Sequence, residues 1–300
     1  MERKINERLR NHSRRKKNRQ RGDTNSDYLR SEEQEILTDF TQQELEEMLI
    51  EDGIASKVKG IIGIGKEASV YWIEDNKGND LALKMFRIHR TSHNFNSLHA
   101  RSKLSDTGKL SIASGLCRRE FLNLTYMYEG GVRVPTPVAH HEFIYTMKFL
   151  GDKYGSAPLL GSVNLKRFYI DPIEVLDEIL DNLEIMFTKA MIVHGDFSEH
   201  NIVWFEEKPW IIDVYQSQRY HPEYQTTHRI AKIDALKVLK KDIYEILNHF
   251  EKKYRVSYDP DEVFDAIAKT ENQDWIPTDL LSENIDLDAY IEEQKKVRFD

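Results

Sequence analysis

The chain has 300 residues, of which 40% are hydrophobic and 31% charged, and a formal net charge of −8. This ordinary soluble composition is long enough for one large domain or for two lobes around a shared cleft. No apolar run approaches the roughly 18 residues of a membrane span, and the N-terminus is basic, so we expect neither a membrane partner nor a secretory signal. The single cysteine, Cys117, forms no internal disulfide, which is typical of a reducing compartment and predicts a cytoplasmic protein.

Charge is unevenly distributed along the chain. Residues 1–22 hold ten Lys and Arg against two Glu, so this segment carries +8 and the remainder carries −16. The basic run RNHSRRKKNRQR (10–21) has the composition that neutralises nucleic-acid phosphates. A solvated tail without a partner explains the same charge equally well. Residues 1–30 are poor in apolar side chains, which predicts a disordered tail.

The N-terminal half predicts a small antiparallel sheet. A helix is expected from Thr41, where Glu44 completes a capping box, to Gly53. Residues 58–75 have the pattern of a β-hairpin with a glycine-rich tip, and 81–86 form the next expected strand.

Helices dominate the expected structure after that sheet. Residues 87–115 are polar and predict a flexible loop, and two strands are expected in 132–149, the second at 142–149. Asp171 is the expected N-cap of a helix that begins at Pro172. Helices are expected at 116–131, 172–191 and 228–252.

The segment HGDFSEHNIVW (194–204) indicates phosphoryl transfer. Asp196 and Asn201 have the spacing of a loop in which the acid accepts a hydroxyl proton while the amide holds a metal ion. Asp213 follows the apolar run WII and is the expected second metal ligand. An amide and an acid suit a hard cation such as Mg²⁺, with Mn²⁺ as an alternative, because such ions take few protein ligands beside triphosphate oxygens.

A glycine turn upstream is a candidate phosphate loop. Gly63, Gly65 and Lys66 lie at the tip of the expected hairpin, where main-chain groups can approach phosphates. The turn lies between strands, so it is neither a Walker loop nor a dinucleotide-binding loop, both of which open a helix.

Lys84, on the strand LALKMF, is the candidate for binding the α- and β-phosphates of ATP. Its expected partner is a glutamate on the following helix. Glu120 is the better candidate, and Glu129 near the end of that helix is the alternative.

The stretch YTMKFLG (145–151) is the candidate adenine-binding hinge. Main-chain groups near Lys148 and Leu150 would meet the adenine, and Met147 would line the back of the pocket.

Parts of an ordinary protein kinase are missing. Gly195 stands where such kinases have arginine, and no Phe-Gly or Ala-Pro-Glu follows Asp213. Only 87 residues remain after that aspartate, so we expect a reduced C-terminal lobe.

These motifs resemble the RIO kinases, atypical serine/threonine kinases of ribosome maturation. GIGKEASVY, which includes Ser69, is similar to the family's phosphate loop, VHGDFSEHNIVW to its catalytic loop, and IIDVYQS to its metal loop. GKEA, SEHN and GSAPLL favour the type-one branch. LKMFRIHRTSH is similar to type two, but the roughly 60 residues before the phosphate loop are too few for that branch's winged-helix domain.

The resemblance implies an α+β, two-lobed protein-kinase-like fold with an antiparallel-sheet N-lobe and a reduced, mostly helical C-lobe. The expected boundaries are a basic tail (1–30), a helical extension (31–58), an N-lobe with a flexible loop at 87–115 (59–150), a C-lobe (151–265) and an acidic tail (266–300).

The resemblance also implies a serine/threonine protein kinase and ATPase that uses ATP and Mg²⁺. Asp196 would be the catalytic acid or base, and Asp213 could itself accept phosphate. Expected partners are the small-subunit pre-ribosome with its RNA, through residues 10–21, and the chain itself. Autophosphorylation candidates in the family's mobile loop are Ser105, Ser111 and Ser114.

Three features depart from the family pattern. Tyr215 replaces a small residue in the metal loop, Lys148 replaces a hinge acid, and residues 223–238 look like an insertion.

Two other functions fit part of the pattern. An aminoglycoside or choline phosphotransferase shares the H-G-D-x-x-x-x-N loop, but it usually lacks Gly-Lys-Glu-Ala and has a larger C-terminal lobe. A nucleotide-binding scaffold without catalysis is the third alternative.

Overall fold

The computed structural model describes residues 42–87, 106–220 and 232–269, which form two compact units. The sheet unit comprises residues 42–87, 106–121 and 137–149, and the helical unit comprises 122–136, 150–220 and 232–269. This grouping differs from the predicted lobe boundaries in placing residues 122–136 with the later segment. We keep the predicted boundaries as a proposal.

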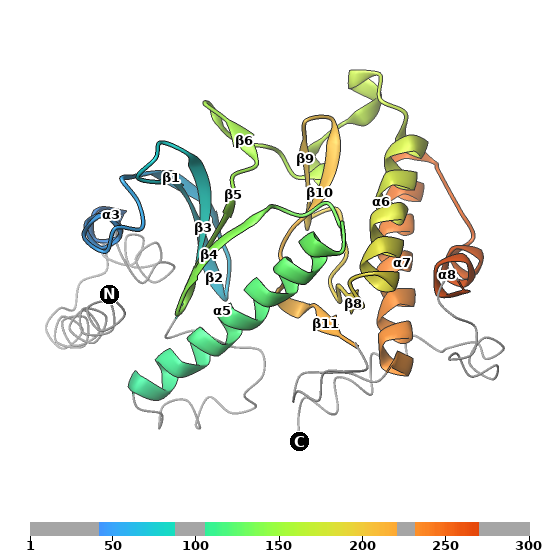
Figure 1. Ribbon diagram of the computed structural model, residues 1–300. Helices are drawn as coiled ribbons and strands as arrows, with labels where there is room; N and C mark the ends of the chain where they lie inside the picture. The colour runs from blue at the N-terminus through green and yellow to red at the C-terminus, as the bar shows by residue number, and fades with distance from the viewer. Residues whose placement is uncertain (1–41, 88–105, 221–231, 270–300) are drawn as a thin grey trace, which may run out of the picture. The chain divides into compact units, whose positions relative to one another are not determined.

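A five-stranded antiparallel sheet forms the sheet unit, in the order β1-β2-β3-β5-β4 (Figure 1). The predicted hairpin is present as β1 and β2, and its glycine-rich tip spans residues 65–67. The strands are β1 Lys57–Ile64, β2 Ala68–Glu74, β3 Asp80–Phe86, β4 Pro137–His141 and β5 Ile144–Lys148.

The helix α3 (Gln42–Glu51) lies beside β1 (Figure 1). Leu45, Met48 and Leu49 on one helix face are buried, as the apolar spacing predicts. Gly53 ends this segment with φ +71, a left-handed conformation that glycine adopts without steric cost. The predicted N-terminal residue Thr41 lies outside the described residues.

The helix α5 (Asp106–Glu129) corrects one prediction. Residues 106–115, expected in a flexible loop, are helical, and residues 88–105 lie outside the described part. Ala113, Cys117 and Leu124 are buried on one face of α5, so small side chains continue the apolar stripe into a serine-rich segment. Ser111 and Ser114 therefore lie on a helix rather than a loop, and Ser105 is outside the described residues.

Three packed helices form the body of the helical unit: α6 (Pro172–Thr188), α7 (Lys232–Tyr254) and α8 (Pro260–Lys269) (Figure 1). Asp171 caps α6 as predicted, accepting a hydrogen bond from the Ile173 amide at 2.9 Å. The sequence pattern did not indicate α8, which occupies the start of the predicted acidic tail. Residues 270–300 lie outside the described part, and so do residues 221–231 of the proposed insertion.

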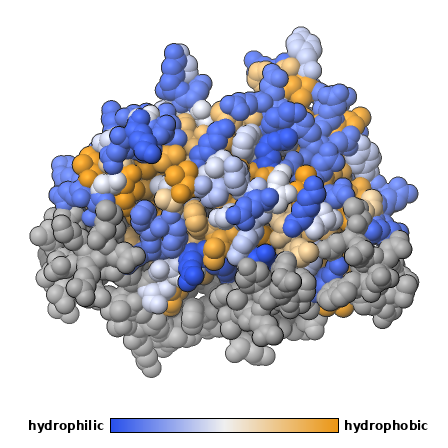
Figure 2. Space-filling model, in the orientation of Figure 1, coloured by the Kyte–Doolittle hydropathy of each residue, from blue (hydrophilic) through white to orange (hydrophobic). Residues whose placement is uncertain are grey.

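Short strands and 3-10 turns complete the helical unit. None of its helices, nor any other helix in the described ranges, carries an apolar stretch that would reach across a bilayer. The face in Figure 2 is mostly hydrophilic. The strands are β6 Gly151–Asp152, β7 Gly155–Ser156, β8 Ile192–Val193, β9 Ile202–Phe205, β10 Lys208–Ile211 and β11 Gln218–Arg219. The 3-10 turns are η2 Leu160–Ser162, η3 Leu165–Phe168 and η4 Val214–Gln216.

Candidate active site

The loop of residues 194–201 connects β8 to β9 and carries two of the predicted site residues. Strands β9 and β10 form an antiparallel pair, so the start of β9 lies beside the end of β10. The Ile212 amide accordingly donates to the Asn201 carbonyl at 2.9 Å. This pairing brings the polar end of the loop next to the segment that leads into Asp213, as the spacing of the motif predicts.

Asp196 and Asn201 are in direct contact. The Asn201 side-chain amide donates to the Asp196 main-chain carbonyl at 2.7 Å and to its Oδ2 at 3.0 Å. Because the amide nitrogen is used in this way, the Oδ1 oxygen of Asn201 is the atom left to bind a cation. No cluster of three or more His, Cys, Asp or Glu side chains suited to a metal occurs in the described ranges. A Mg²⁺ ion at Asn201 and Asp213 would therefore need oxygens from its nucleotide.

Asp213 adopts a left-handed backbone conformation, with φ 58 and ψ 62, immediately before η4. Aspartate tolerates this region better than most residues, at a cost of about 1 kcal/mol. The conformation ends the extended run after β10 and turns the chain at the candidate metal ligand. The sequence placed Asp213 after the strand but held no sign of this turn.

His194 is buried beside both acids. Its Nε2 lies 3.2 Å from the Ile212 carbonyl oxygen, so Nε2 carries the proton and donates. Burial lowers the pKa of His194, while the charges of Asp213 and Asp196 oppose that shift. Both carboxylates therefore act electrostatically on one neutral imidazole.

Gly195 explains a departure from ordinary kinases. Its φ is +82, and a Cβ at this position would lie 3.2 Å from the Gln216 carbonyl oxygen. An arginine there would meet both a strained backbone and this close contact. The close approach of the loop to η4 thus depends on the absence of a side chain.

Asp242 on α7 is a site residue that the sequence analysis missed. It is fully buried, and its carboxylate accepts main-chain hydrogen bonds from His194 at 3.1 Å, Gly195 at 3.0 Å and Phe197 at 3.4 Å. Burial raises the pKa of Asp242 to about 7, against the opposing effect of these hydrogen bonds. The signal was an acid placed beside Ile243 among the apolar positions of a helix, where an unpaired charge is costly.

Lys84 and Glu120 form a buried ion pair in the sheet unit. The Lys84 Nζ lies 2.6 Å from the Glu120 Oε1, and the Tyr145 hydroxyl donates to the same oxygen at 3.2 Å. Glu129, the alternative partner, is exposed at the end of α5. The geometry thus selects Glu120, while the role of the pair toward ATP stays a prediction.

Cys117, one helical turn before Glu120, is a buried free thiol. Burial, and then the Glu120 charge, hold the pKa of Cys117 far above its usual range. The thiol therefore stays protonated and is not an activated nucleophile.

The candidate phosphate loop is the tip of the β1–β2 hairpin. Gly63 pairs with Val70, and the Gly65 amide donates to the Ala68 carbonyl at 2.9 Å. Gly65 and Lys66 are exposed. Ser69 differs from the expectation, because it is buried and its Oγ accepts a hydrogen bond from Arg87 at 3.1 Å. Its side chain supports the sheet rather than the tip of the loop.

The candidate hinge residues belong to different units. Met147 and Lys148 are half-buried in β5 of the sheet unit. Leu150 is buried in the helical unit, and its carbonyl accepts a hydrogen bond from the Ala157 amide at 2.9 Å. That carbonyl already has a partner, so the adenine contacts proposed for this stretch stay a prediction.

Comparison with known proteins identifies the family. The RIO domain model matches residues 69–263, which include Lys84, Asp196 and Asp213. The chain belongs to the RIO family. The type-one assignment within this RIO family stays a prediction, because relatives named after several types match.

Two RIO relatives and one solved structure illustrate the match. The serine/threonine-protein kinase rio1 of Dictyostelium discoideum is 27% identical over 81% of this chain, which spans 40% of that protein. The RIO-type serine/threonine-protein kinase Rio1 of Haloferax volcanii is 26% identical over 81% of this chain and 79% of its own length. A crystal structure of a Rio2 kinase-ADP/Mg²⁺-phosphoaspartate complex from Chaetomium thermophilum has a TM-score of 0.54 and 22% identity, covering 84% of this chain and 75% of that one.

The structural likeness establishes the fold. The chain has the α+β, protein-kinase-like fold of the RIO kinases, with an antiparallel sheet and a helical unit. Because the chain spans about two fifths of the length of the Dictyostelium relative, its activity and partners are treated as proposals below.

Proposed function

We propose that the chain is an ATP- and Mg²⁺-dependent serine/threonine protein kinase and ATPase of the RIO type. The observation that carries this proposal is the contact between Asp196 and Asn201, in a loop whose far end is paired with the segment leading to Asp213. The names of the RIO relatives support a serine/threonine kinase. Catalysis of this kind depends on positioning and on charge neutralisation, which suits an acid, an amide and a lysine.

Each residue has a defined role in the proposal. Asp196 would accept the proton of the acceptor hydroxyl, and its orientation is set by the Asn201 amide. Asn201 Oδ1 and Asp213 would hold the Mg²⁺ or Mn²⁺ that neutralises the phosphate charge. Lys84, held by Glu120, would bind the α- and β-phosphates. Main-chain groups at Gly63, Gly65 and Lys66 would approach the phosphates, and 147–150 the adenine.

A second step can occur at Asp213. A carboxylate oxygen of Asp213 would attack the γ-phosphorus, the bond to the β–γ bridging oxygen would break, and ADP would leave. The resulting acyl phosphate would react with water to give phosphate and the free carboxylate. The name of the Chaetomium Rio2 structure includes a phosphoaspartate, which supports this chemistry within the family.

The proposed setting is maturation of the small ribosomal subunit in the cytoplasm. This part rests on the family resemblance and on the basic run 10–21, which lies outside the described residues. Positive side chains of this run would neutralise RNA phosphates, so binding should weaken as salt rises.

The testing experiment is ATP turnover with γ-labelled nucleotide, followed by chemical analysis of the protein-bound label. An acid-labile, hydroxylamine-sensitive label that is lost in Asp213→Ala would support the phosphoaspartate ATPase. An acid-stable label on serine, lost in Asp196→Ala, would support a protein kinase. Absence of turnover in a folded wild-type chain that binds ATP would contradict the proposal and favour the scaffold alternative. Robust turnover that requires an aminoglycoside or choline would favour the small-molecule kinase.

A further inference from the structure

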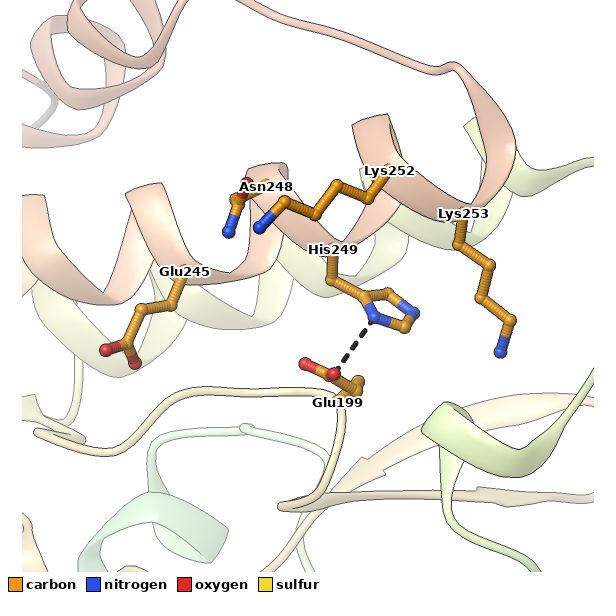
Figure 3. Close-up of a pocket in the computed structure, with 6 residues that line it drawn as sticks. All are labelled: Glu199, Glu245, Asn248, His249, Lys252 and Lys253. Atoms are coloured by element: carbon orange, nitrogen blue, oxygen red, sulfur yellow. Dashed lines mark ion pairs between the residues drawn. The ribbon is translucent and has the colours of Figure 1, made fainter.

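A pocket of about 300 Å³ lies in the helical unit where the 194–201 loop meets α7 (Figure 3). One lining side chain comes from the loop, and the others come from successive turns of the helix. The lining residues are Glu199, Glu245, Asn248, His249, Lys252 and Lys253. The proposed mechanism uses none of them. Glu199 nevertheless lies three residues after Asp196 in the chain, so the pocket adjoins the proposed catalytic centre.

His249 fixes the Glu199 carboxylate without cancelling its charge. The His249 Nδ1 lies 3.2 Å from the Glu199 Oε1, and only 10% of the His249 side chain is exposed. Burial lowers the pKa of His249, although the Glu199 charge raises it in part, so the imidazole is neutral at pH 7. Nδ1 then donates to the carboxylate, and the buried Nε2 is an acceptor without a hydrogen-bond partner in the described part of the chain.

Glu245 adds a second carboxylate to the pocket. Its ion-pair partner Lys241 is 3.5 Å away and also donates to the Gly195 carbonyl at 3.3 Å. Burial raises the pKa of Glu245, and the negative charges of Asp196 and Glu199 raise it further. These charges place Glu245 in the same negative field as the proposed catalytic acid.

The two lysines of the pocket leave this field largely uncompensated. The Lys253 Nζ donates to the carbonyls of Gly161 at 2.7 Å and Val163 at 2.8 Å, so it is committed to the main chain. Lys252 is exposed to solvent, which screens its charge. The pocket therefore presents fixed carboxylates beside Asp196, together with the amide oxygen of Asn248.

We propose that this pocket binds a basic side chain, arginine or lysine, of the polypeptide that the chain phosphorylates. Guanidinium and ammonium groups carry only donors, which matches walls made of carboxylate and amide oxygens. Arginine fits better than lysine, because its planar group can bond two separated carboxylates at once. The inference rests on the proposed kinase function, and it assigns that kinase a preference for acceptors with a basic residue near the target serine.

The test uses alanine-based peptides with one serine, in which a single arginine is moved from position to position. The wild-type chain should prefer arginine at one or two positions over the arginine-free peptide, by about tenfold in kcat/KM. Glu245→Gln and Glu199→Gln should each reduce this preference toward unity. Glu245→Lys should shift the preference at the same position toward glutamate. Glu251→Gln is the matched control, because Glu251 is an exposed acid on the same helix outside the pocket, and it should keep the preference.

Peptide binding without ATP, followed by fluorescence anisotropy, keeps the inference testable apart from catalysis. The arginine peptide should bind the wild type about tenfold tighter than the arginine-free peptide, and Glu245→Gln should remove the difference. Equal kcat/KM and equal binding for all peptides would overturn the inference. An equal loss in Glu251→Gln would overturn it as well, since only general surface charge would then be at work. ATP turnover without peptide reports on the proposed function separately: turnover without arginine preference removes the pocket assignment alone.

Discussion

Asp242→Asn tests whether the buried acid of α7 carries the electrostatic cost that its environment implies. The substitution removes the charge at nearly constant volume. The Asp242 carboxylate accepts hydrogen bonds from three main-chain amides. Asparagine keeps one acceptor oxygen and turns an NH₂ group toward at least one of those amides. At acidic pH the variant should therefore be less stable than the wild type, by about 1–3 kcal/mol.

The difference between the two proteins should shrink as pH rises. The pKa of Asp242 is raised from 3.8 to about 7 in the folded state. Its contribution to stability is thus fully present below pH 3.8 and is lost as pH rises through about 7. Integrating the linkage relation with these two values gives a loss of about 2.5 kcal/mol between pH 5 and pH 8. The asparagine variant has no such loss.

Urea denaturation at several pH values between 5 and 8 measures this directly. The unfolding free energy of the wild type should fall relative to Asp242→Asn by about 2.5 kcal/mol over the range. Asp234→Asn, at a well-exposed acid on the same helix, is the control and should give a profile parallel to that of the wild type. If the profile of Asp242→Asn is also parallel, the carboxylate does not titrate in this range and the reasoning fails.

Other substitutions test the remaining features. Lys84→Met strands the buried charge of Glu120 and should cost about 3–5 kcal/mol in urea denaturation; the double variant with Glu120→Gln should recover part of that loss, and full additivity would contradict the pairing. Gly195→Ala, at φ +82, should lower the unfolding free energy by about 1–2 kcal/mol, whereas Gly115→Ala, in an open helical position, should raise it by up to about 1 kcal/mol; equal effects would exclude the backbone explanation. Asn201→Ala should raise the Mg²⁺ concentration needed for half-maximal ATP turnover about tenfold or more, and an unchanged requirement would remove Asn201 from the metal site.

Local signals predicted much of the fold. Gly53, the hairpin at 58–75 and the Asp171 cap depend on neighbouring residues, and all three occur as expected. The start of α5 was missed because its buried face uses small side chains such as Ala113, which hydrophobic spacing underweights. The helix α8 was missed because packing against α6 and α7 stabilises it, and that packing is not local.

The candidate site shows the same limit. The spacing of Asp196, Asn201 and Asp213 predicted a cluster because strands joined by a short turn must pair. Asp242 could not be assigned in this way, since its partners are about 45 residues earlier in the chain and are main-chain amides. The burial of Ser69 also depends on a distant residue, Arg87, reached through the β2–β3 register.

The attachment of Asp242 to main-chain amides has a consequence for how this site can evolve. Every non-proline residue supplies the same N–H group, so a change of side chain at Phe197 leaves its bond to Asp242 available. Compensating pairs of substitutions are therefore not expected between α7 and the loop. Among homologues the contact should appear as a single unvarying acid opposite positions free to differ, and methods that infer contacts from correlated change would overlook it.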